Sequence, residues 1–308
     1  MKPRIVVLAT GGTIAGSGQT GKDTGYKSGV ISAESLISSV PALAEVADIQ
    51  TIQVCNINSD DITDKIWIEL ANTINCMAQD DSVTGFVVTH GTDTLEETAY
   101  FLDLTVKTDK PVVVTGAMRP ATAASPDGPA NLLLAVEAAA SGANRGKGVL
   151  VAFAGRLFPA REAVKRHTAA LDAVTSDGES GGSRLHTTST EFDVSGLKEL
   201  PKVTVLYFNV DADPGIVEYA ASRSEGIVIA GAGAGEFSLL WKSAIEKCRV
   251  PVVVSSRTGC GPVLQETMVC PNAVAAGTLN PAKAAVLLRL ALTRTRDTKE
   301  LVRIFGIY

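Results

Sequence analysis

Histidine and cysteine are scarce in this chain of 308 residues, and their spacing argues against a metal site. The three histidines are His90, His167 and His186, and the five cysteines contain no C-x-x-C pair. Zinc sites need several such side chains close together, so we expect no metal. An odd number of scattered cysteines is typical of free thiols in and around a core.

The sequence also lacks an excess of positive charge and any apolar run long enough to cross a membrane. Its net charge of −5 argues against non-specific nucleic-acid binding. The apolar run after Arg4 ends at Gly11, which is too short for the h-region of a signal peptide. We therefore predict a cytoplasmic protein without nucleic-acid or membrane partners. The alternative is a periplasmic protein whose leader peptide has been removed.

What the chain does contain is a regular alternation of strand-like and helix-like segments, which predicts an α/β fold. A polar stretch over 171–195 interrupts this series. We predict two α/β domains, a larger N-terminal one with a mainly parallel sheet and a smaller, flavodoxin-like C-terminal one. The predicted limits are 1–191 for the first domain, 192–212 for a linker and 213–308 for the second.

Two apolar strands each lead into a threonine that follows glycine. Residues 5–9 (IVVLA) lead into Thr13, and residues 86–89 (FVVT) lead into Thr92. Short β-branched runs suit strands buried on both faces of a parallel sheet, and ligands bind outside the carboxyl ends of such strands. Both threonines are therefore expected in a functional crevice.

Several residues signal the ends of helices. Ser32 is expected to be the N-cap of a helix over 33–39. Asp93 or Thr94 is expected to cap the helix that follows the second threonine. Asn280, followed by proline, predicts the start of the final helix.

Thr13, Tyr26 and Lys165 are candidates for chemistry, each with a simpler explanation. Thr13 is either a nucleophile or a turn hydroxyl. Tyr26, in the glycine-rich loop over 17–29, is either a lid residue or a surface aromatic. Lys165 is a surface charge unless it meets Thr92, where it could take part in proton transfer.

Substrate binding is assigned to residues after the strands. Ser59 and Asp60 follow a strand, where hydroxyl and backbone N–H groups suit a small carboxylate; a helix-start turn is the alternative. The carboxylate of Asp93 can bind an ammonium group.

A dinucleotide site is the rival interpretation of the glycines. Residues 16–21 (GSGQTG) match G-x-G-x-x-G, but no apolar helix follows them. Residues 231–235 (GAGAG) follow a strand but misplace the third glycine. We therefore expect no cofactor.

Taken together, the motifs resemble the bacterial L-asparaginases, in particular the type II asparaginase/glutaminase-asparaginase group. The resemblance extends over essentially the whole chain, and its second motif is long enough to be highly specific. The matching stretches are residues 9–16 (ATGGTIAG), 89–99 (THGTDTLEETA), 116–120 (GAMRP), 127–132 (DGPANL) and 277–281 (GTLNP).

The resemblance implies an enzyme that hydrolyses L-asparagine to L-aspartate and ammonia. Thr13 would form an acyl-enzyme with Tyr26 beside it, and Thr92, Asp93 and Lys165 would form a supporting triad. A homotetramer, built as a pair of close dimers, would complete each site from a neighbouring subunit. The implied substrate-binding residues are Gly12, Ser59, Asp60, Thr92, Asp93 and Glu266.

Some positions depart from the family pattern. Asp60 stands where many members carry Gln or Glu, and residues 231–236 (GAGAGE) lack asparagines that some members have there. Val164 and Arg166 replace threonines often found beside Lys165. Glu266 is the best match for the acidic residue given by the neighbouring subunit. These departures leave open the preference between asparagine and glutamine.

Three other functions compete with asparagine hydrolysis. A glutaminase or mixed activity keeps the same fold. An amino-acid sensor would bind without turnover, which the full set of candidate catalytic residues disfavours. A nucleotide-binding oxidoreductase is the last alternative.

Overall fold

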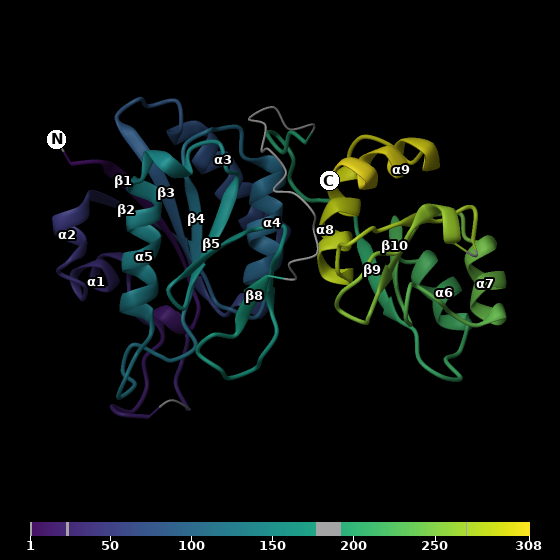
Figure 1. The fold of residues 1–308 in the computed structure, drawn as a ribbon, viewed down its shortest axis with the longest axis horizontal. Helices are drawn as coiled ribbons and strands as arrows, with labels where there is room; N and C mark the ends of the chain where they lie inside the picture. Colours follow the sequence, from purple (N-terminus) through teal and green to yellow (C-terminus); the bar gives the residue numbers. More distant parts are fainter. Residues whose placement is uncertain (1, 23–24, 177–191, 269) are drawn as a thin grey trace. The chain divides into compact units, whose positions relative to one another are not determined.

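β-Branched strands can be buried on both faces only where helices cover both sides of a sheet. The computed structural model, which describes residues 2–22, 25–176, 192–268 and 270–308, contains two sheets of this kind (Figure 1). The chain forms two compact units, one extending to Lys198 and one running from Glu199 to Tyr308. The boundary between the units falls within the range predicted as a linker. No helix in the described ranges combines the length and apolar character of a bilayer span.

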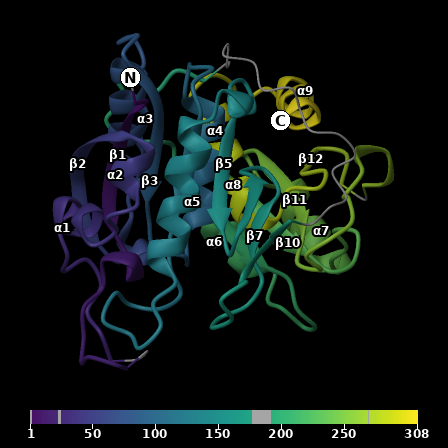
Figure 2. The same ribbon diagram turned by 60° about the vertical axis from the view of Figure 1, so that its left-hand side comes forward.

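The first unit has a six-stranded sheet in the order β2-β1-β3-β4-β5-β6. The first five strands are parallel and β6 is antiparallel, so the predicted mainly parallel sheet is confirmed. Figure 2 shows β2, β1 and β3 next to one another. The strands are β1 (Arg4–Gly11), β2 (Asp48–Ile57), β3 (Val83–Thr89), β4 (Val112–Thr115), β5 (Val149–Phe153) and β6 (Arg156–Pro159).

This strand order decides where a ligand can bind. In an order 2-1-3-4-5, chain connections leave β1 and β3 in opposite directions, and a crevice opens at the carboxyl ends of these two strands. Thr13 follows β1 and Thr92 follows β3. The topology therefore brings the two threonines of the sequence analysis to one crevice.

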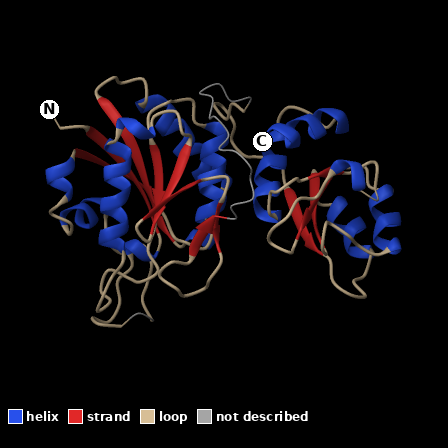
Figure 3. Ribbon diagram, in the orientation of Figure 1, coloured by secondary structure: helices blue, strands red, loops and turns tan. Residues whose placement is uncertain are grey.

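Helices cover both faces of the first sheet (Figure 3). Ile5 and Val7 of β1 share a buried cluster with Leu36, Leu43 and Leu132, which come from three helices. The helices of the first unit are α1 (Ala33–Ser38), α2 (Leu43–Val46), α3 (Asp64–Met77), α4 (Leu95–Thr105) and α5 (Gly128–Ala140).

Helices α3 and α4 are joined by aromatic packing. The rings of Trp67 and Phe101 stack with centroids 5.0 Å apart. Because α4 begins directly after the Thr92 segment, this packing fixes the helix that follows the second threonine.

A two-stranded antiparallel ribbon lies outside both large sheets. It consists of β7 (Ala163–Lys165) and β8 (Val174–Ser176). A ribbon of two short strands is marginally stable by itself, so its position depends on contacts with other elements.

The second unit has a smaller parallel sheet in the order β12-β11-β10-β9. Strand β9 lies within the range predicted as a linker and pairs with β10. The elements are β9 (Val203–Tyr207), β10 (Gly226–Gly231), β11 (Val252–Ser256), β12 (Val274–Ala275), α6 (Gly215–Ala221), α7 (Leu239–Glu246), α8 (Pro281–Leu292) and α9 (Thr298–Ile307).

Two of the predicted caps are confirmed with their hydrogen bonds, a third has the position without the bond, and one helix prediction is wrong. The side chains of Ser32 and Asn280 accept the expected N–H bonds at the starts of α1 and α8. Thr94, one of the two candidates, stands at the N-cap position of α4, but its side chain makes no capping hydrogen bond. The helix at Asn280 is not the last one, because α9 follows it and is capped by Asp297. The apolar spacing of Leu301, Ile304 and Phe305, all buried, was the signal for α9.

Candidate active site

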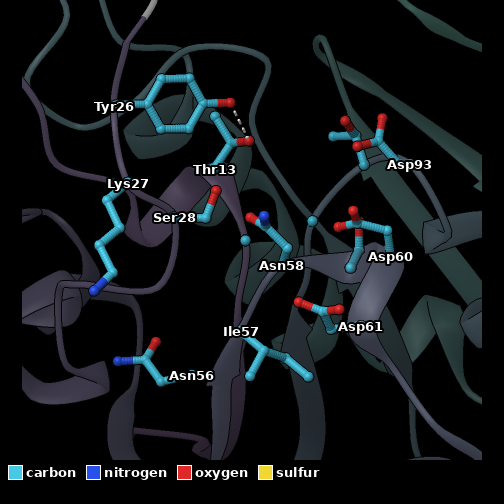
Figure 4. A pocket seen from close by; sticks show the side chains of 14 residues that line it. Thr13, Tyr26, Lys27, Ser28, Asn56, Ile57, Asn58, Asp60, Asp61 and Asp93 are labelled. Carbon is cyan, nitrogen blue, oxygen red and sulfur yellow. Dashed lines mark hydrogen bonds between the residues drawn. The ribbon is translucent and has the colours of Figure 1, made fainter.

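A pocket of about 590 Å³ opens at the carboxyl ends of β1, β2 and β3 (Figure 4). This volume lies in the range of small-molecule sites. The wall is formed by residues 12–13 after β1, 26–28 of the following loop, 56–61 at the end of β2 and 91–93 after β3. The pocket thus joins segments that are far apart in the sequence.

Two glycines in the wall of this pocket are in close contact. Gly12 has a φ of +76°, and a Cβ on it would lie 2.3 Å from the backbone nitrogen of Gly91. A Cβ on Gly91 would in turn lie 2.7 Å from Oγ of Ser59. Only glycine permits this approach, and through it the loops after β1 and β3 meet.

Gly12→Ala should therefore damage both stability and function. We expect the free energy of unfolding to fall by about 1–3 kcal/mol, because φ is positive and the backbones clash. Displacing the loops by about 1 Å should lower kcat by about 100-fold. Gly146→Ala is the matched control, because Gly146 has a φ of +71° but open space around it. Urea unfolding and steady-state kinetics measure both effects, and equal kinetic losses in the two variants would contradict this explanation.

Thr13 meets the phenol of Tyr26. The two oxygens are 2.8 Å apart, and Thr13 begins a short 3₁₀ helix, η1 (Thr13–Ala15). The loop that carries Tyr26 is closed by two backbone hydrogen bonds between Ser17 and Lys27, at 3.0 and 2.9 Å. The Tyr26 ring covers Gly16, where a Cβ would lie 2.9 Å from a ring atom. The structure therefore brings together the hydroxyl and the aromatic that the sequence singled out.

Lys165 links the second threonine to an aspartate. Its Nζ donates to Oγ1 of Thr92 at 2.8 Å and to Oδ1 of Asp93 at 2.5 Å. Its side chain is 15% exposed, whereas that of Asp93 is 70% exposed. Its backbone N–H donates to Oε2 of Glu96 at 2.7 Å, which ties β7 to the first turn of α4. The surface-charge explanation for Lys165 is excluded by these contacts.

The remaining predicted binding residues are divided between the two units. Ser59 is buried at the start of η2 (Ser59–Asp61), and its carbonyl accepts a 2.6 Å bond from Thr94. Asp60 is exposed in the pocket wall. Glu266 is exposed in η4 (Gln265–Thr267) of the second unit and does not line this pocket.

Backbone N–H groups in the pocket are open to a ligand. Gly12 donates to the carbonyl of Ile57 at 2.9 Å, so its N–H is already used. The N–H groups of Thr13, Gly91 and Thr92 donate to no residue that the structure describes. Such donors suit an oxygen that gains negative charge during a reaction.

The charges around the pocket are unevenly distributed. Its lining contains Asp60, Asp61 and Asp93 and one cation, Lys27. This balance favours a ligand with an ammonium group on the aspartate side. Within the described residues, no set of three or more His, Cys, Asp or Glu side chains is placed to hold a metal.

His90 supports the pocket from inside the core, a role that the sequence analysis missed. Its Nδ1 lies 2.7 Å from the carbonyl of Gly91, so Nδ1 carries the proton. Its Nε2 then accepts from Thr98 at 2.9 Å, and the Thr98 oxygen accepts from Trp67 at 2.8 Å. Burial lowers the pKa of His90 to about 4, which keeps the ring neutral. The apolar strand before His90 was the only signal of this burial.

This histidine should make stability depend on acidity. The pKa of His90 is about 4 in the folded chain, whereas the ordinary value, which applies to the unfolded chain, is 6.5. Below pH 6.5 the unfolded chain therefore binds more protons, and the free energy of unfolding should fall by about 3 kcal/mol as the pH drops through this window. Urea unfolding at pH 7.5 and 4.5 measures this loss. His90→Asn should lose clearly less stability over that range, and an equal loss would contradict the assignment.

Comparison with known proteins gives matches over nearly the whole chain. Residues 4–194 match the family model described as asparaginase, N-terminal. Residues 202–305 match the one described as glutaminase/asparaginase C-terminal domain.

Individual relatives agree with the family models. The chain is 44% identical to the probable periplasmic L-asparaginase of Haemophilus influenzae, covering 98% of this chain and 92% of the relative. It is 43% identical to L-asparaginase 2 of Escherichia coli, covering 99% and 93%. The crystal structure of a probable cytoplasmic L-asparaginase from Campylobacter jejuni superposes with a TM-score of 0.94 at 42% identity, covering 100% of both chains.

Proposed function

This chain belongs to the asparaginase family, and from that premise we propose that it hydrolyses L-asparagine to L-aspartate and ammonia. One observation carries the proposal: two threonine hydroxyls share a pocket, one bonded to a phenol and the other to an ammonium group. Acyl transfer from an amide needs a nucleophile, a proton for the departing amine and donors for the oxyanion. The pocket offers a group for each need.

We assign the nucleophile to Thr13. Its Oγ1 attacks the side-chain carbonyl carbon of asparagine, and the phenol of Tyr26 exchanges a proton with it. The carbon–nitrogen bond breaks, and the leaving nitrogen takes up the proton that the Thr13 hydroxyl gave up, so that it departs as ammonia. Water then attacks the resulting ester, releases aspartate and restores the threonine hydroxyl. The open N–H groups of Thr13 and Thr92 support the oxyanion in both steps.

The second group of residues serves proton transfer and substrate orientation. Lys165 holds Thr92 and Asp93 through two hydrogen bonds and supplies a positive charge beside the reacting carbonyl. Asp93 and Asp60 receive the α-ammonium group, and Ser59 receives the α-carboxylate. Binding of both the α-ammonium and the α-carboxylate group positions the side-chain amide for attack by Thr13. Analogues that lack either charged group bind less well.

Glutamine is the second candidate substrate. Asp60 is one methylene shorter than glutamate, which leaves room beside the ammonium group in a pocket of about 590 Å³. The chain is also 38% identical to a Pseudomonas fluorescens protein named glutaminase-asparaginase, over 99% of this chain and 90% of that protein. One methylene discriminates by about 1–3 kcal/mol, so a preference for asparagine with some glutaminase activity is expected.

Ammonia release from L-asparagine and L-glutamine, measured side by side, tests this function. Turnover of asparagine supports it, and the ratio of the two kcat/KM values gives the preference. Aspartate binding without turnover of either amide would indicate the sensor instead. A rise in melting temperature on adding NAD would favour the oxidoreductase.

We further propose that the active form is a homotetramer made of two close dimers, in which Glu266 of a neighbouring subunit approaches the pocket. Light scattering after gel filtration measures the mass, and Glu266→Gln should raise KM in the tetramer. We also propose two domains joined by a linker that lies within 192–212, and a cytoplasmic location. Cell fractionation tests the location, since relatives of both compartments are similar to this chain.

A further inference from the structure

Ser28 lines the pocket, yet no part of the proposed chemistry uses it. Its side chain is half-buried, and in Figure 4 its hydroxyl points toward Thr13. In the part of the chain that the structure describes, no residue hydrogen-bonds this hydroxyl. A polar group that faces a ligand pocket without a protein partner is available to the ligand.

The backbone holds Ser28 in place from both sides. On one side, Lys27 is paired with Ser17 through two backbone hydrogen bonds. On the other side, the N–H of Gly29 donates to the carbonyl of Gly12 at 3.2 Å. Gly29 has a φ of +63°, and a Cβ on it would lie 2.8 Å from the backbone of Asn56. The hydroxyl is therefore a fixed part of the wall.

The direction of the neighbouring side chains supports this placement. Successive side chains alternate in a paired segment, so Tyr26 and Ser28 share one side and Lys27 takes the other. Figure 4 shows this arrangement, with Lys27 directed away from Thr13. The loop thus presents two hydroxyl groups to the nucleophile, and the phenol is already bonded to it.

The donors and acceptors of a primary amide indicate which hydrogen bond the Ser28 hydroxyl can form with a substrate. The side-chain carbonyl oxygen of the substrate can accept hydrogen bonds from the backbone N–H groups of Thr13, Gly91 and Thr92. The amide nitrogen carries two N–H donors and needs an acceptor. Ser28 Oγ has free acceptor capacity beside the reacting threonine.

We propose that Ser28 is a specificity-determining residue whose Oγ accepts a hydrogen bond from the side-chain –NH₂ of the substrate. The inference rests on the proposed function and deepens it, because it explains how this site selects a primary amide. An analogue without that N–H cannot form the hydrogen bond. Removal of the Ser28 hydroxyl leaves the amide N–H of the substrate without an acceptor.

The experiment compares two ligands that differ at this nitrogen. The measurements are kcat/KM for L-asparagine and the inhibition constant of the β-methyl ester of L-aspartate, which has no side-chain N–H. Ser28→Ala should lower kcat/KM for asparagine by about tenfold, and the inhibition constant of the ester should stay within about twofold. Ser28→Thr keeps a hydroxyl and is the matched control that should recover most of the loss. Thermal unfolding shows that the variants are folded.

Each contrary result has a distinct meaning. Parallel losses for both ligands would overturn the inference, because they indicate a general distortion of the loop. An unchanged kcat/KM in Ser28→Ala would overturn it while leaving asparagine hydrolysis intact. Absence of ammonia release by the unaltered protein would overturn the proposed function and this inference with it.

Discussion

Thr13→Ala is expected to lower kcat for L-asparagine by at least about 10⁴-fold, because loss of a nucleophile removes the covalent route altogether. Thr13 starts a short 3₁₀ helix, and among the described residues its hydroxyl hydrogen-bonds Tyr26 alone, so the side chain contributes little to the fold. The free energy of unfolding should therefore change by less than about 1 kcal/mol. Ammonia release and urea unfolding are the two measurements.

Aspartate binding distinguishes loss of chemistry from loss of the pocket. The Thr13→Ala variant should bind L-aspartate with nearly the affinity of the unaltered protein, because the proposed clamp on the amino-acid backbone is intact. Tyr26→Phe should show a smaller kinetic loss, about 100-fold, since a proton-transfer group is removed while the nucleophile stays. Full activity of Thr13→Ala would refute the assigned mechanism.

Lys165→Met is expected to lower kcat by about 1,000-fold, because it removes the ammonium group that bonds Thr92 and Asp93. Methionine keeps the length of the side chain, so the ribbon formed by β7 and β8 should stay in place. Asp93 is largely exposed, and water can solvate its carboxylate after the change. The effect on stability should therefore be below about 1 kcal/mol.

Lys110→Met provides the matched control. The ammonium group of Lys110 donates to the carbonyls of Ala78 and Asp80, just beyond the end of α3, at 2.9 and 2.7 Å. This variant should lose about 1–3 kcal/mol of unfolding free energy and keep its kcat. The two lysine variants should thus show opposite patterns. A large kinetic loss in Lys110→Met, or a mainly structural effect of Lys165→Met, would contradict the role given to Lys165.

Local patterns were sufficient to predict much of the fold. The short β-branched runs before Thr13 and Thr92 predicted parallel strands, and β1 and β3 confirm them. Serine and asparagine before apolar periodicity marked the starts of α1 and α8 correctly. These signals are reliable because they depend on neighbours within one turn or one strand.

Several features that the sequence did not reveal depended on partners that are distant in the sequence. Asp93 or Thr94 was expected to cap α4, but the Asp93 carboxylate pairs with Lys165 and the Thr94 hydroxyl donates to the carbonyl of Ser59. The ribbon of β7 and β8 has strands of three residues each, too short to give a clear pattern. The burial of His90 follows from helix α3, which brings Trp67 to Thr98.

The sequence by itself determined which side chains stand at strand exits and which family the motifs resemble, because both are properties of contiguous residues. Only the tertiary structure decided which of these side chains meet. Lys165 reaches Thr92 across 73 positions of the chain, and its neighbours in sequence do not reveal that contact. The reason is physical: the strand order 2-1-3 brings the exits of β1 and β3 together, and the Gly12–Gly91 contact and the Glu96 bond then set the distances within the pocket.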